Sequence, residues 1–145
     1  MADPHPQGEI PFNPTVVYRA LPYENLIRRT GEHKENTFYR HPRRDPDGLS
    51  VTTSIAACKA QFQRPIFGIR RVDVAAVRAY GLEFFPDSDS HANIRFPDGT
   101  NIPVPGVDDP TGKNIASDLM SMSVPVDHWD AENADEIEAT LLNRN

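Results

Sequence analysis

This chain has little cysteine and no long apolar run, and its first residues do not resemble a secretory leader. Its 145 residues include one cysteine, Cys58, which excludes an internal disulfide and any zinc site built from several cysteines. No apolar run approaches the roughly 18 residues that cross a bilayer. Residues 1–14 lack the cationic and apolar regions of a secretory signal. We therefore expect a cytoplasmic protein that makes no use of the membrane.

The familiar nucleotide and hydrolase motifs are also missing. The sequence contains no Walker loop, no GxGxxG and no serine nucleophile elbow, so it does not belong to the commonest classes defined by those motifs. The segment Asp87–His91 gathers oxygen ligands and an imidazole, but it lacks the glycine and distal glutamate of an EF-hand and the paired histidines of a zincin. We expect no metal site here, and we expect this turn to position His91.

The chain is rich in proline and divides its charge unevenly. Fourteen prolines in 145 residues predict many turns and loops. Residues 17–78 hold 12 of the 15 Lys and Arg but only 6 of the 21 Asp and Glu, whereas residues 79–145 hold 13 of the acidic residues. The net charge of −6 therefore conceals a basic block. Either the two halves neutralise one another across the fold, or the basic block faces an anionic ligand.

Short hydrophobic runs separated by turn residues predict a single α+β domain. We expect a twisted, mostly antiparallel sheet of about five or six short strands with two or three helices. The expected strands are 16–21, 49–53, 66–74, 82–85 and 91–96, and the expected helices are 55–62 and 131–142. Residues 114–122 fit a short helix, residues 23–29 fit two helical turns, and residues 74–80 fit a helix or a strand. Residues 1–14 should form an extended Pro-rich arm, residues 15–126 the α+β domain, and residues 127–145 an acidic C-terminal helix or tail.

Two groups of residues in the first half are candidate ligand contacts. Tyr18 and Arg19 end the first strand, where an arginine fork can bind a phosphate or carboxylate; otherwise Arg19 is an exposed strand residue. The basic loop 28–44 interleaves Arg, Lys and His with Phe38 and Tyr39, so it can bind phosphates and stack on bases, or it is a solvated loop.

A third candidate follows this loop. Residues 47–54 combine a turn, a strand and a helix start with several hydroxyl groups, which suits a polar or anionic ligand. The alternative is a structural role, with Ser54 as the N-cap and Thr52 as a strand former. His91, at the start of a predicted strand, is a general base, a hydrogen-bonding partner of a ligand or a structural histidine.

Three segments together resemble those of a family of small bacterial proteins. Residues 38–42, 47–51 and 91–94 carry the pattern FxRxP…DGLSV…HAxI. The order of features is also similar to that of compact ADP-ribosyltransferase-like domains, including the RES toxins and the RNA 2′-phosphotransferases. Those families place an Arg or His on a first strand, a hydroxyl-bearing strand next and a helix after it, and they hold NAD in the cleft between.

This resemblance implies an NAD-binding, ADP-ribosyltransferase-like or NAD glycohydrolase-like domain, of the kind found in toxin-type effectors. The catalytic residues it implies are Arg19, Glu83 and His91, with Glu83 stabilising an oxocarbenium-like transition state. The cofactor contacts it implies are Tyr18, Arg19, Tyr39, Arg40, Ser50, Thr52 and Ser54. None of the predicted strands carries the Glu-x-Glu signature of the mono-ADP-ribosyltransferases, and the Glu-x-Glu at residues 136–138 falls in the predicted C-terminal helix.

Two other functions fit the same charge pattern. The protein is a non-catalytic interaction module of a larger bacterial assembly if the basic block or the acidic tail meets a protein partner. It is an RNA-binding domain if the basic loop 28–44 follows a phosphate backbone. Another anionic small molecule could also take the place of NAD.

Overall fold

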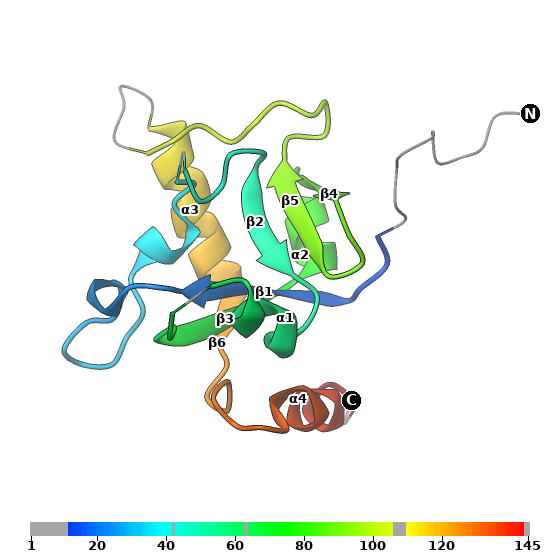
Figure 1. The fold of residues 1–145 in the computed structure, drawn as a ribbon. Coiled ribbons are helices and arrows are strands. Elements are labelled where there is room, and N and C mark those ends of the chain that lie inside the picture. Colours follow the sequence, from blue (N-terminus) through cyan, green and yellow to red (C-terminus); the bar gives the residue numbers. More distant parts are fainter. Residues whose placement is uncertain (1–11, 42, 63, 106–109, 144–145) are drawn as a thin grey trace, which may run out of the picture.

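A six-stranded antiparallel sheet organises the computed structural model, which describes residues 12–41, 43–62, 64–105 and 110–143 (Figure 1). Its strands are β1 (Val16–Leu21), β2 (Leu49–Thr52), β3 (Gly68–Asp73), β4 (Glu83–Pro86), β5 (His91–Arg95) and β6 (Ser123–Pro125). They lie in the order β4-β5-β2-β1-β3-β6, and every neighbouring pair is antiparallel. The predicted α+β class and antiparallel sheet are confirmed.

Four α-helices and two 3-10 turns complete the described part of the chain. The helices are α1 (Ile55–Ala60), α2 (Val74–Tyr80), α3 (Thr111–Met122) and α4 (Ala134–Leu142), and the turns are η1 (Glu24–Leu26) and η2 (Glu35–Phe38). Helix α1 begins where the sequence predicts, because the Ser54 side chain accepts a hydrogen bond from the Ala57 N–H at 3.0 Å. The two helical turns expected over residues 23–29 are instead the single turn η1, and β6 was not predicted.

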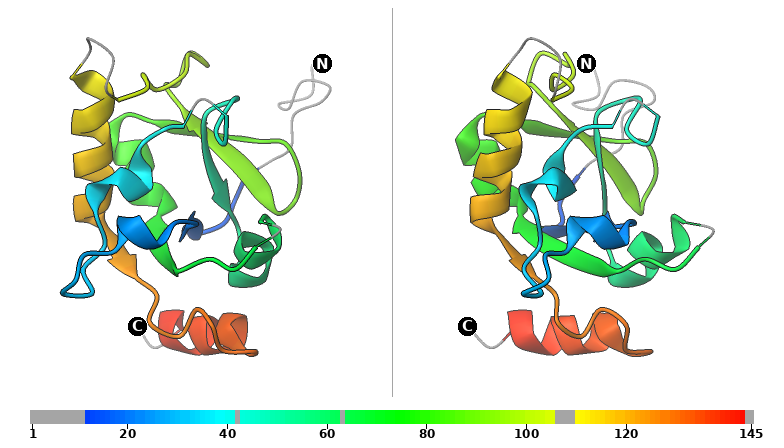
Figure 2. Two further views of the ribbon diagram at one scale, coloured as in Figure 1. Left: turned by 60° about the vertical axis from the view of Figure 1, so that its left-hand side comes forward. Right: turned by 90° about the vertical axis from the view of Figure 1, so that its left-hand side faces the viewer.

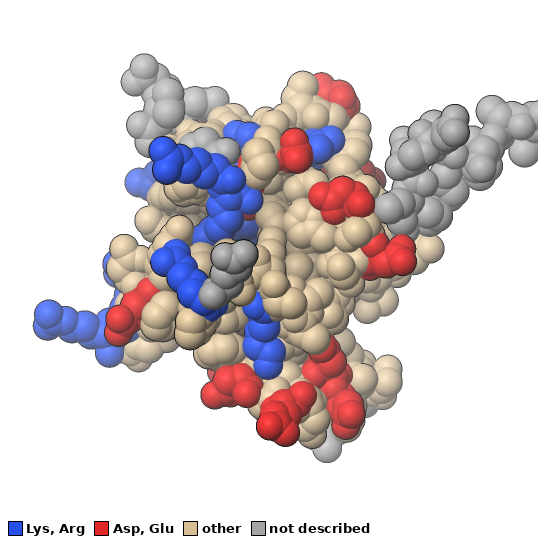
Figure 3. Space-filling view, viewed as in Figure 1, with Lys and Arg blue, Asp and Glu red and all other residues tan. Residues whose placement is uncertain are grey.

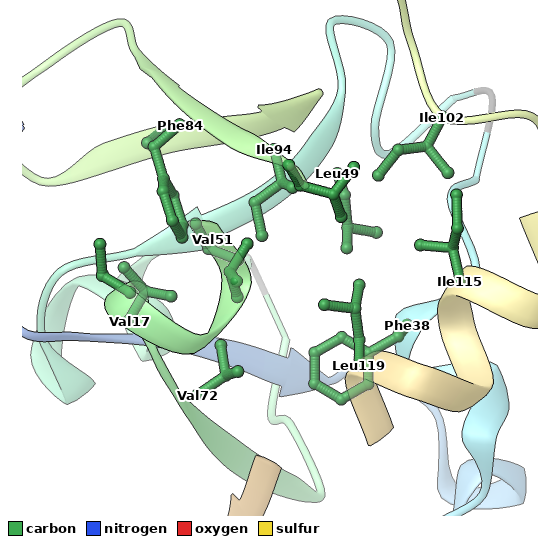
Figure 4. Packing of buried hydrophobic residues seen from close by; sticks show 14 of the residues in the cluster. Val17, Phe38, Leu49, Val51, Val72, Phe84, Ile94, Ile102, Ile115 and Leu119 are labelled. Atoms are coloured by element: carbon green, nitrogen blue, oxygen red, sulfur yellow. The ribbon is translucent and has the colours of Figure 1, made fainter. Parts of the chain in front are cut away.

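The sheet separates two layers of helices. Helices α2 and α3 pack on one face, where the larger hydrophobic core lies, and α1 and α4 pack on the other (Figures 1 and 2). Strand alternation sends Leu49 and Val51 of β2 into the larger core (Figure 4). Ser50 and Thr52 therefore face the side of the sheet that carries α1.

The sheet divides between β1 and β2. Strand β1 pairs with β3 along all six of its residues, but its ladder with β2 contains the single pair Tyr18 and Thr52. In Figure 1, β2 and β5 run across the direction of β1 and β3. This division leaves part of the β2 backbone to find partners outside the sheet.

Polar contacts attach helix α4 to the rest of the fold. The Asp135 carboxylate accepts hydrogen bonds from the N–H groups of Ile55 at 2.7 Å and Ala56 at 3.0 Å, at the start of α1. Glu138 is only 2% exposed and accepts hydrogen bonds from Tyr18 Oη and Arg71 Nη1, both at 2.7 Å. Asp135 and Glu138 thus attach α4, the helix of the expected C-terminal segment, to the start of α1 and to strands β1 and β3. Within the described residues, no helix is long and apolar enough to cross a membrane.

Candidate functional site

The Arg19 guanidinium is buried inside the protein. The side chain is 3% exposed, and Nη1 and Nη2 donate to the two carboxylate oxygens of Asp45 at 2.9 and 3.0 Å. Its other N–H groups donate to the backbone carbonyls of Thr37, Tyr39 and Ser50. All five donors of the side chain are therefore used within the fold. We assign Arg19 a structural role in place of the phosphate contact expected from the sequence.

The Arg19–Asp45 pair replaces main-chain hydrogen bonds where β1 and β2 separate. The register of these strands would place Ala20 opposite Ser50 if the ladder continued. Instead, the Ser50 N–H donates to Asp45 Oδ1 at 3.0 Å and the Ser50 carbonyl accepts from Arg19 Nη1 at 2.8 Å. Burial alone would raise the pKa of Asp45, but the charge and hydrogen bonds of Arg19 outweigh burial and lower it. The pair thus holds β2 in place with charged groups.

A pocket of about 380 Å³ opens between η1, η2, the following loop and residues 104–105. This volume lies in the range of about 300–1,000 Å³ typical of ligand sites. The side chains that give the pocket its chemistry are two tyrosines, two asparagines and three basic residues, namely Tyr23, Tyr39, Asn25, Asn36, Arg40, His41 and Arg44. No carboxylate is among the described residues that line it. The pocket therefore combines aromatic surface with positive charge.

Asp45 is hydrogen-bonded to Arg19 and forms only a longer ion pair with Arg44, which faces the pocket. The Asp45 oxygens already accept four hydrogen bonds, two from Arg19 and one each from the N–H groups of Ser50 and His41. The Arg44 Nε lies 3.9 Å from Asp45 Oδ2, beyond hydrogen-bonding distance. Burial, with the nearby Arg19 charge, lowers the pKa of Arg44 to about 10, so Arg44 remains charged at neutral pH.

Arg40 adds a second cation to the pocket. Its Nη2 donates to the carbonyl of Pro46 at 3.2 Å, a neutral acceptor. Its Nε is buried and has no hydrogen-bond partner among the described residues. Tyr23 also lines the pocket. The guanidinium carbons of Arg64 and Arg44 lie 4.7 and 6.0 Å from the centroid of its ring, within the range of cation–π contacts.

Ser50, His91 and Asp87 form a hydrogen-bonded chain on the other side of β2. The Ser50 Oγ lies 2.5 Å from His91 Nε2, and His91 Nδ1 lies 2.7 Å from Asp87 Oδ1. Gln61 Nε2, at the end of α1, donates to Ser50 Oγ at 2.7 Å. A second pocket of about 270 Å³ reaches His91, Gln61 and Thr52. The turn before β5 does position His91, as the sequence suggested, with Asp87 as its partner.

The other predicted site residues are dispersed. Tyr18 is buried against Glu138, and Ser54 caps α1, which is the structural alternative for that serine. Thr52 Oγ1 donates to the Ser54 carbonyl at 3.1 Å. Glu83 forms an ion pair with Arg78 at 2.7 Å, at the end of the β4–β5 hairpin opposite to His91. Of the predicted residues, the structure brings together only Tyr39 with Arg40, and Ser50 and Thr52 with His91.

Sequence reasoning missed Asp45, Gln61 and Asp87 as partners of these groups. Asp45 lies just past the basic loop 28–44, and Gln61 lies within the predicted helix 55–62; no motif surrounds either residue. Asp87 had a detectable signal, since it lies four residues before His91 at a turn that precedes a strand.

The surface charges are segregated as the sequence suggested. Figure 3 shows Lys and Arg gathered over the region of η1, η2 and the following loop. Asp and Glu gather over α4 and around the β4–β5 hairpin on the same face. The pocket with Arg40 and Arg44 therefore lies in the basic half of the protein.

Comparisons of the chain with protein-family models, with curated proteins and with solved structures find no match. In the part of the chain that the structure describes, no three His, Cys, Asp or Glu side chains are grouped to hold a metal ion.

Proposed function

We propose that the protein binds NAD, or a closely related anionic nucleotide, and acts on it as an ADP-ribosyltransferase-like or NAD glycohydrolase-like domain. The observation that carries this proposal is the pocket that places Tyr23 and Tyr39 beside Arg40 and Arg44. Aromatic faces stack on bases, and arginine forks bind phosphate oxygens. NAD offers an adenine and a pyrophosphate at the same time, so it uses both kinds of group.

The order of elements supports the same proposal. Arg19 lies on β1, the hydroxyl-bearing Ser50 and Thr52 lie on β2, and α1 follows, as in the ADP-ribosyltransferase-like domains that the sequence resembles. In this proposal Arg19 positions the pocket, since it binds the Tyr39 carbonyl and the Asp45 carboxylate at its base. A toxin-type effector of this class would meet NAD in the cytoplasm.

Glu83 has no part in the proposed chemistry. Departure of nicotinamide leaves positive charge on the ribose ring, which a nearby carboxylate stabilises. Glu83 was expected to supply that carboxylate, but it is paired with Arg78 at the distant end of its hairpin. Nucleotide binding is therefore the first property to test, and release of nicotinamide is the second.

The test is calorimetric titration of the protein with NAD, ADP-ribose and nicotinamide, on wild type and two matched variants. Arg44→Gln removes a charge inside the pocket, and Arg43→Gln removes one from the exposed neighbouring residue outside it. We expect NAD and ADP-ribose to bind the wild-type protein. Arg44→Gln should weaken this binding about tenfold or more, as the loss of a charge-assisted hydrogen bond does. Arg43→Gln should change the affinity less than twofold. Absence of NAD and ADP-ribose binding to folded wild type would refute the proposal.

RNA binding is the second candidate, because part of the basic region lies outside the pocket. Arg28 and Arg29 are exposed in the turn closed by the pairing of Ile27 with His33 and do not line the pocket. A phosphate backbone that extends beyond the pocket would engage them, whereas a dinucleotide held by the lining residues alone would not. Neutralising Arg28 and Arg29 together would then weaken binding to single-stranded RNA and reduce its salt dependence while leaving NAD binding unchanged. Equal loss of both activities would reject this division of roles.

A further inference from the structure

Hydrogen-bond accounting fixes the direction of the chain through Ser50, His91 and Asp87. Gln61 Nε2 can only donate, so Ser50 Oγ accepts from it at 2.7 Å. The Asp87 carboxylate can only accept, so the proton of the neutral imidazole lies on Nδ1, and Nε2 is the acceptor to which the Ser50 hydroxyl donates at 2.5 Å. The other ring nitrogen, Nδ1, carries its proton toward Asp87 Oδ1 at 2.7 Å. This is the arrangement in which an imidazole can remove a proton from a serine.

We propose that Ser50 is an activated nucleophile, with His91 as its general base and Asp87 as the residue that orients the imidazole, and that this site hydrolyses small esters. This activity is independent of nucleotide binding in the pocket between η1 and η2. The three residues come from β2, from β5 and from the turn before β5. The recognition of such a group depends on its geometry and not on a sequence motif.

The second pocket, which is lined by the two hydrogen-bond partners of Ser50 and not by the buried Ser50 itself, indicates the class of substrate. It measures about 270 Å³ and reaches His91 and Gln61, the two side chains bonded to Ser50 Oγ. Ala57 and Ala60 of α1 supply small apolar walls. These dimensions and walls suit a short acyl group, such as an acetyl ester, better than a long chain.

The proposed reaction is hydrolysis in two steps. Ser50 Oγ attacks the ester carbonyl carbon while its proton passes to His91 Nε2, and the alcohol then leaves with that proton, which gives an acyl-serine. Water next attacks the acyl carbon as His91 takes one of its protons, and that proton returns to Ser50 Oγ as the carboxylic acid departs. Gln61 Nε2 carries a second N–H besides the one bonded to Ser50, and we assign that N–H to the developing oxyanion.

The site has a structural basis for its rigidity. The Arg19–Asp45 pair binds both the N–H and the carbonyl of Ser50. Across the hairpin, the Asp87 N–H donates to the His91 carbonyl at 3.2 Å. Substitution of the Ser50 side chain leaves both backbone contacts in place. Variants at this position are therefore suitable for a functional test.

The test uses an alkyl fluorophosphonate and p-nitrophenyl acetate on the full chain. We expect the fluorophosphonate to add to Ser50 in folded wild type, as located by peptide mass spectrometry, and Ser50→Ala to abolish both labelling and hydrolysis. His91→Gln and Asp87→Asn should slow both by roughly 10²-fold or more, in line with losses in other serine–histidine–aspartate sites. Asp89→Asn, on the same turn, is the matched control, because no contact of its side chain reaches His91 among the described residues, and it should keep the wild-type rate.

A second measurement does not depend on the choice of ester. In Ser50→Cys the introduced thiol should react with iodoacetamide at least about tenfold faster when His91 is present than in the double variant Ser50→Cys with His91→Gln. Cys58 is an internal reference, since burial raises the pKa of its thiol to about 12. Absence of fluorophosphonate addition at Ser50, an unchanged rate in Asp87→Asn, or equal alkylation rates with and without His91 would each overturn the proposal.

Discussion

Arg19 of β1 and Asp45 of the loop before β2 form an ion pair through two hydrogen bonds, with side chains 3% and 0% exposed. The pair occupies the point where β1 and β2 separate and binds the Ser50 N–H and carbonyl that a continued ladder would have bound. Through the carbonyls of Thr37 and Tyr39 it also holds η2 and the wall of the basic pocket. One buried pair therefore connects both candidate sites to the sheet.

Loss of either partner should destabilise the whole fold. Asp45→Asn leaves the Arg19 charge buried without a counter-charge, and Arg19→Lys supplies one nitrogen where three are used. We expect each to lower the free energy of unfolding by about 3–5 kcal/mol, as removal of one partner of a buried ion pair does. Urea denaturation monitored by circular dichroism measures this. Arg78→Lys, at the half-exposed pair with Glu83, is the control and should lower the free energy of unfolding by at most about 1 kcal/mol. An equally small effect of Arg19→Lys would contradict the structural role of Arg19.

Stability should depend on Asp45 at acidic pH. Since the pKa of Asp45 is lower in the folded protein than in the unfolded chain, its contribution is fully present above about pH 4, the ordinary value for aspartate. That contribution is lost as the pH falls through the lower, folded pKa. We therefore expect the free energy of unfolding to fall less steeply below pH 4 in Asp45→Asn than in wild type, in urea titrations between pH 2.5 and 7. Parallel curves would contradict the assignment.

Elements with local signals could be predicted from the sequence, and those that depend on distant partners could not. Residues 16–21 are β1 as expected, because a β-branched and aromatic run ends at a proline. Helix α1 begins after its Ser54 cap. In contrast, β6 has three residues, Ser123–Pro125, and exists because β3 pairs with it. Nothing in those three residues alone distinguishes a strand from a loop.

The same distinction explains the site. The sequence identified the basic loop, Ser50 and His91 because each stands out by residue type. It did not pair Arg19 with Asp45 or Ser50 with His91, which lie 26 and 41 positions apart. An arginine on a strand has the same local pattern whether it faces a ligand or a buried carboxylate. Only the long-range fold decides between these roles.

Glu138 should determine whether α4 stays attached. Its buried carboxylate receives the Tyr18 hydroxyl and the Arg71 guanidinium. We expect Glu138→Gln to lower the free energy of unfolding by about 2 kcal/mol, less than for a fully enclosed pair because the Arg71 side chain is 23% exposed. Glu136→Gln, exposed on the same helix, should change it by less than about 0.5 kcal/mol. Thermal melting compares the stabilities of the two variants. In limited proteolysis, residues 127–143 should be cut faster in Glu138→Gln than in Glu136→Gln. Equal cleavage of the two variants would exclude this anchoring role of Glu138.

Gly112 in α3 should tolerate no side chain, although alanine is usually the better helix residue. A Cβ at this position would lie 2.2 Å from the Pro103 carbonyl oxygen and 3.3 Å from Pro105 N, which are backbone atoms. An alanine in a helix normally stabilises the fold by about 1 kcal/mol relative to glycine. Here residues 103–105 would have to move, so we expect Gly112→Ala to lower the free energy of unfolding by about 1–3 kcal/mol.

The same substitution connects stability to the basic pocket, because Val104 and Pro105 form part of its wall. We expect Gly112→Ala to weaken NAD binding severalfold at a temperature where the variant is still folded, since the wall must shift away from α3. Asn114→Ala, exposed on the same helix, is the control and should change neither stability nor binding appreciably. Urea denaturation and calorimetric titration on both variants separate the two effects. A Gly112→Ala protein at least as stable as wild type would show that α3 and residues 103–105 do not meet as closely as the structure has them.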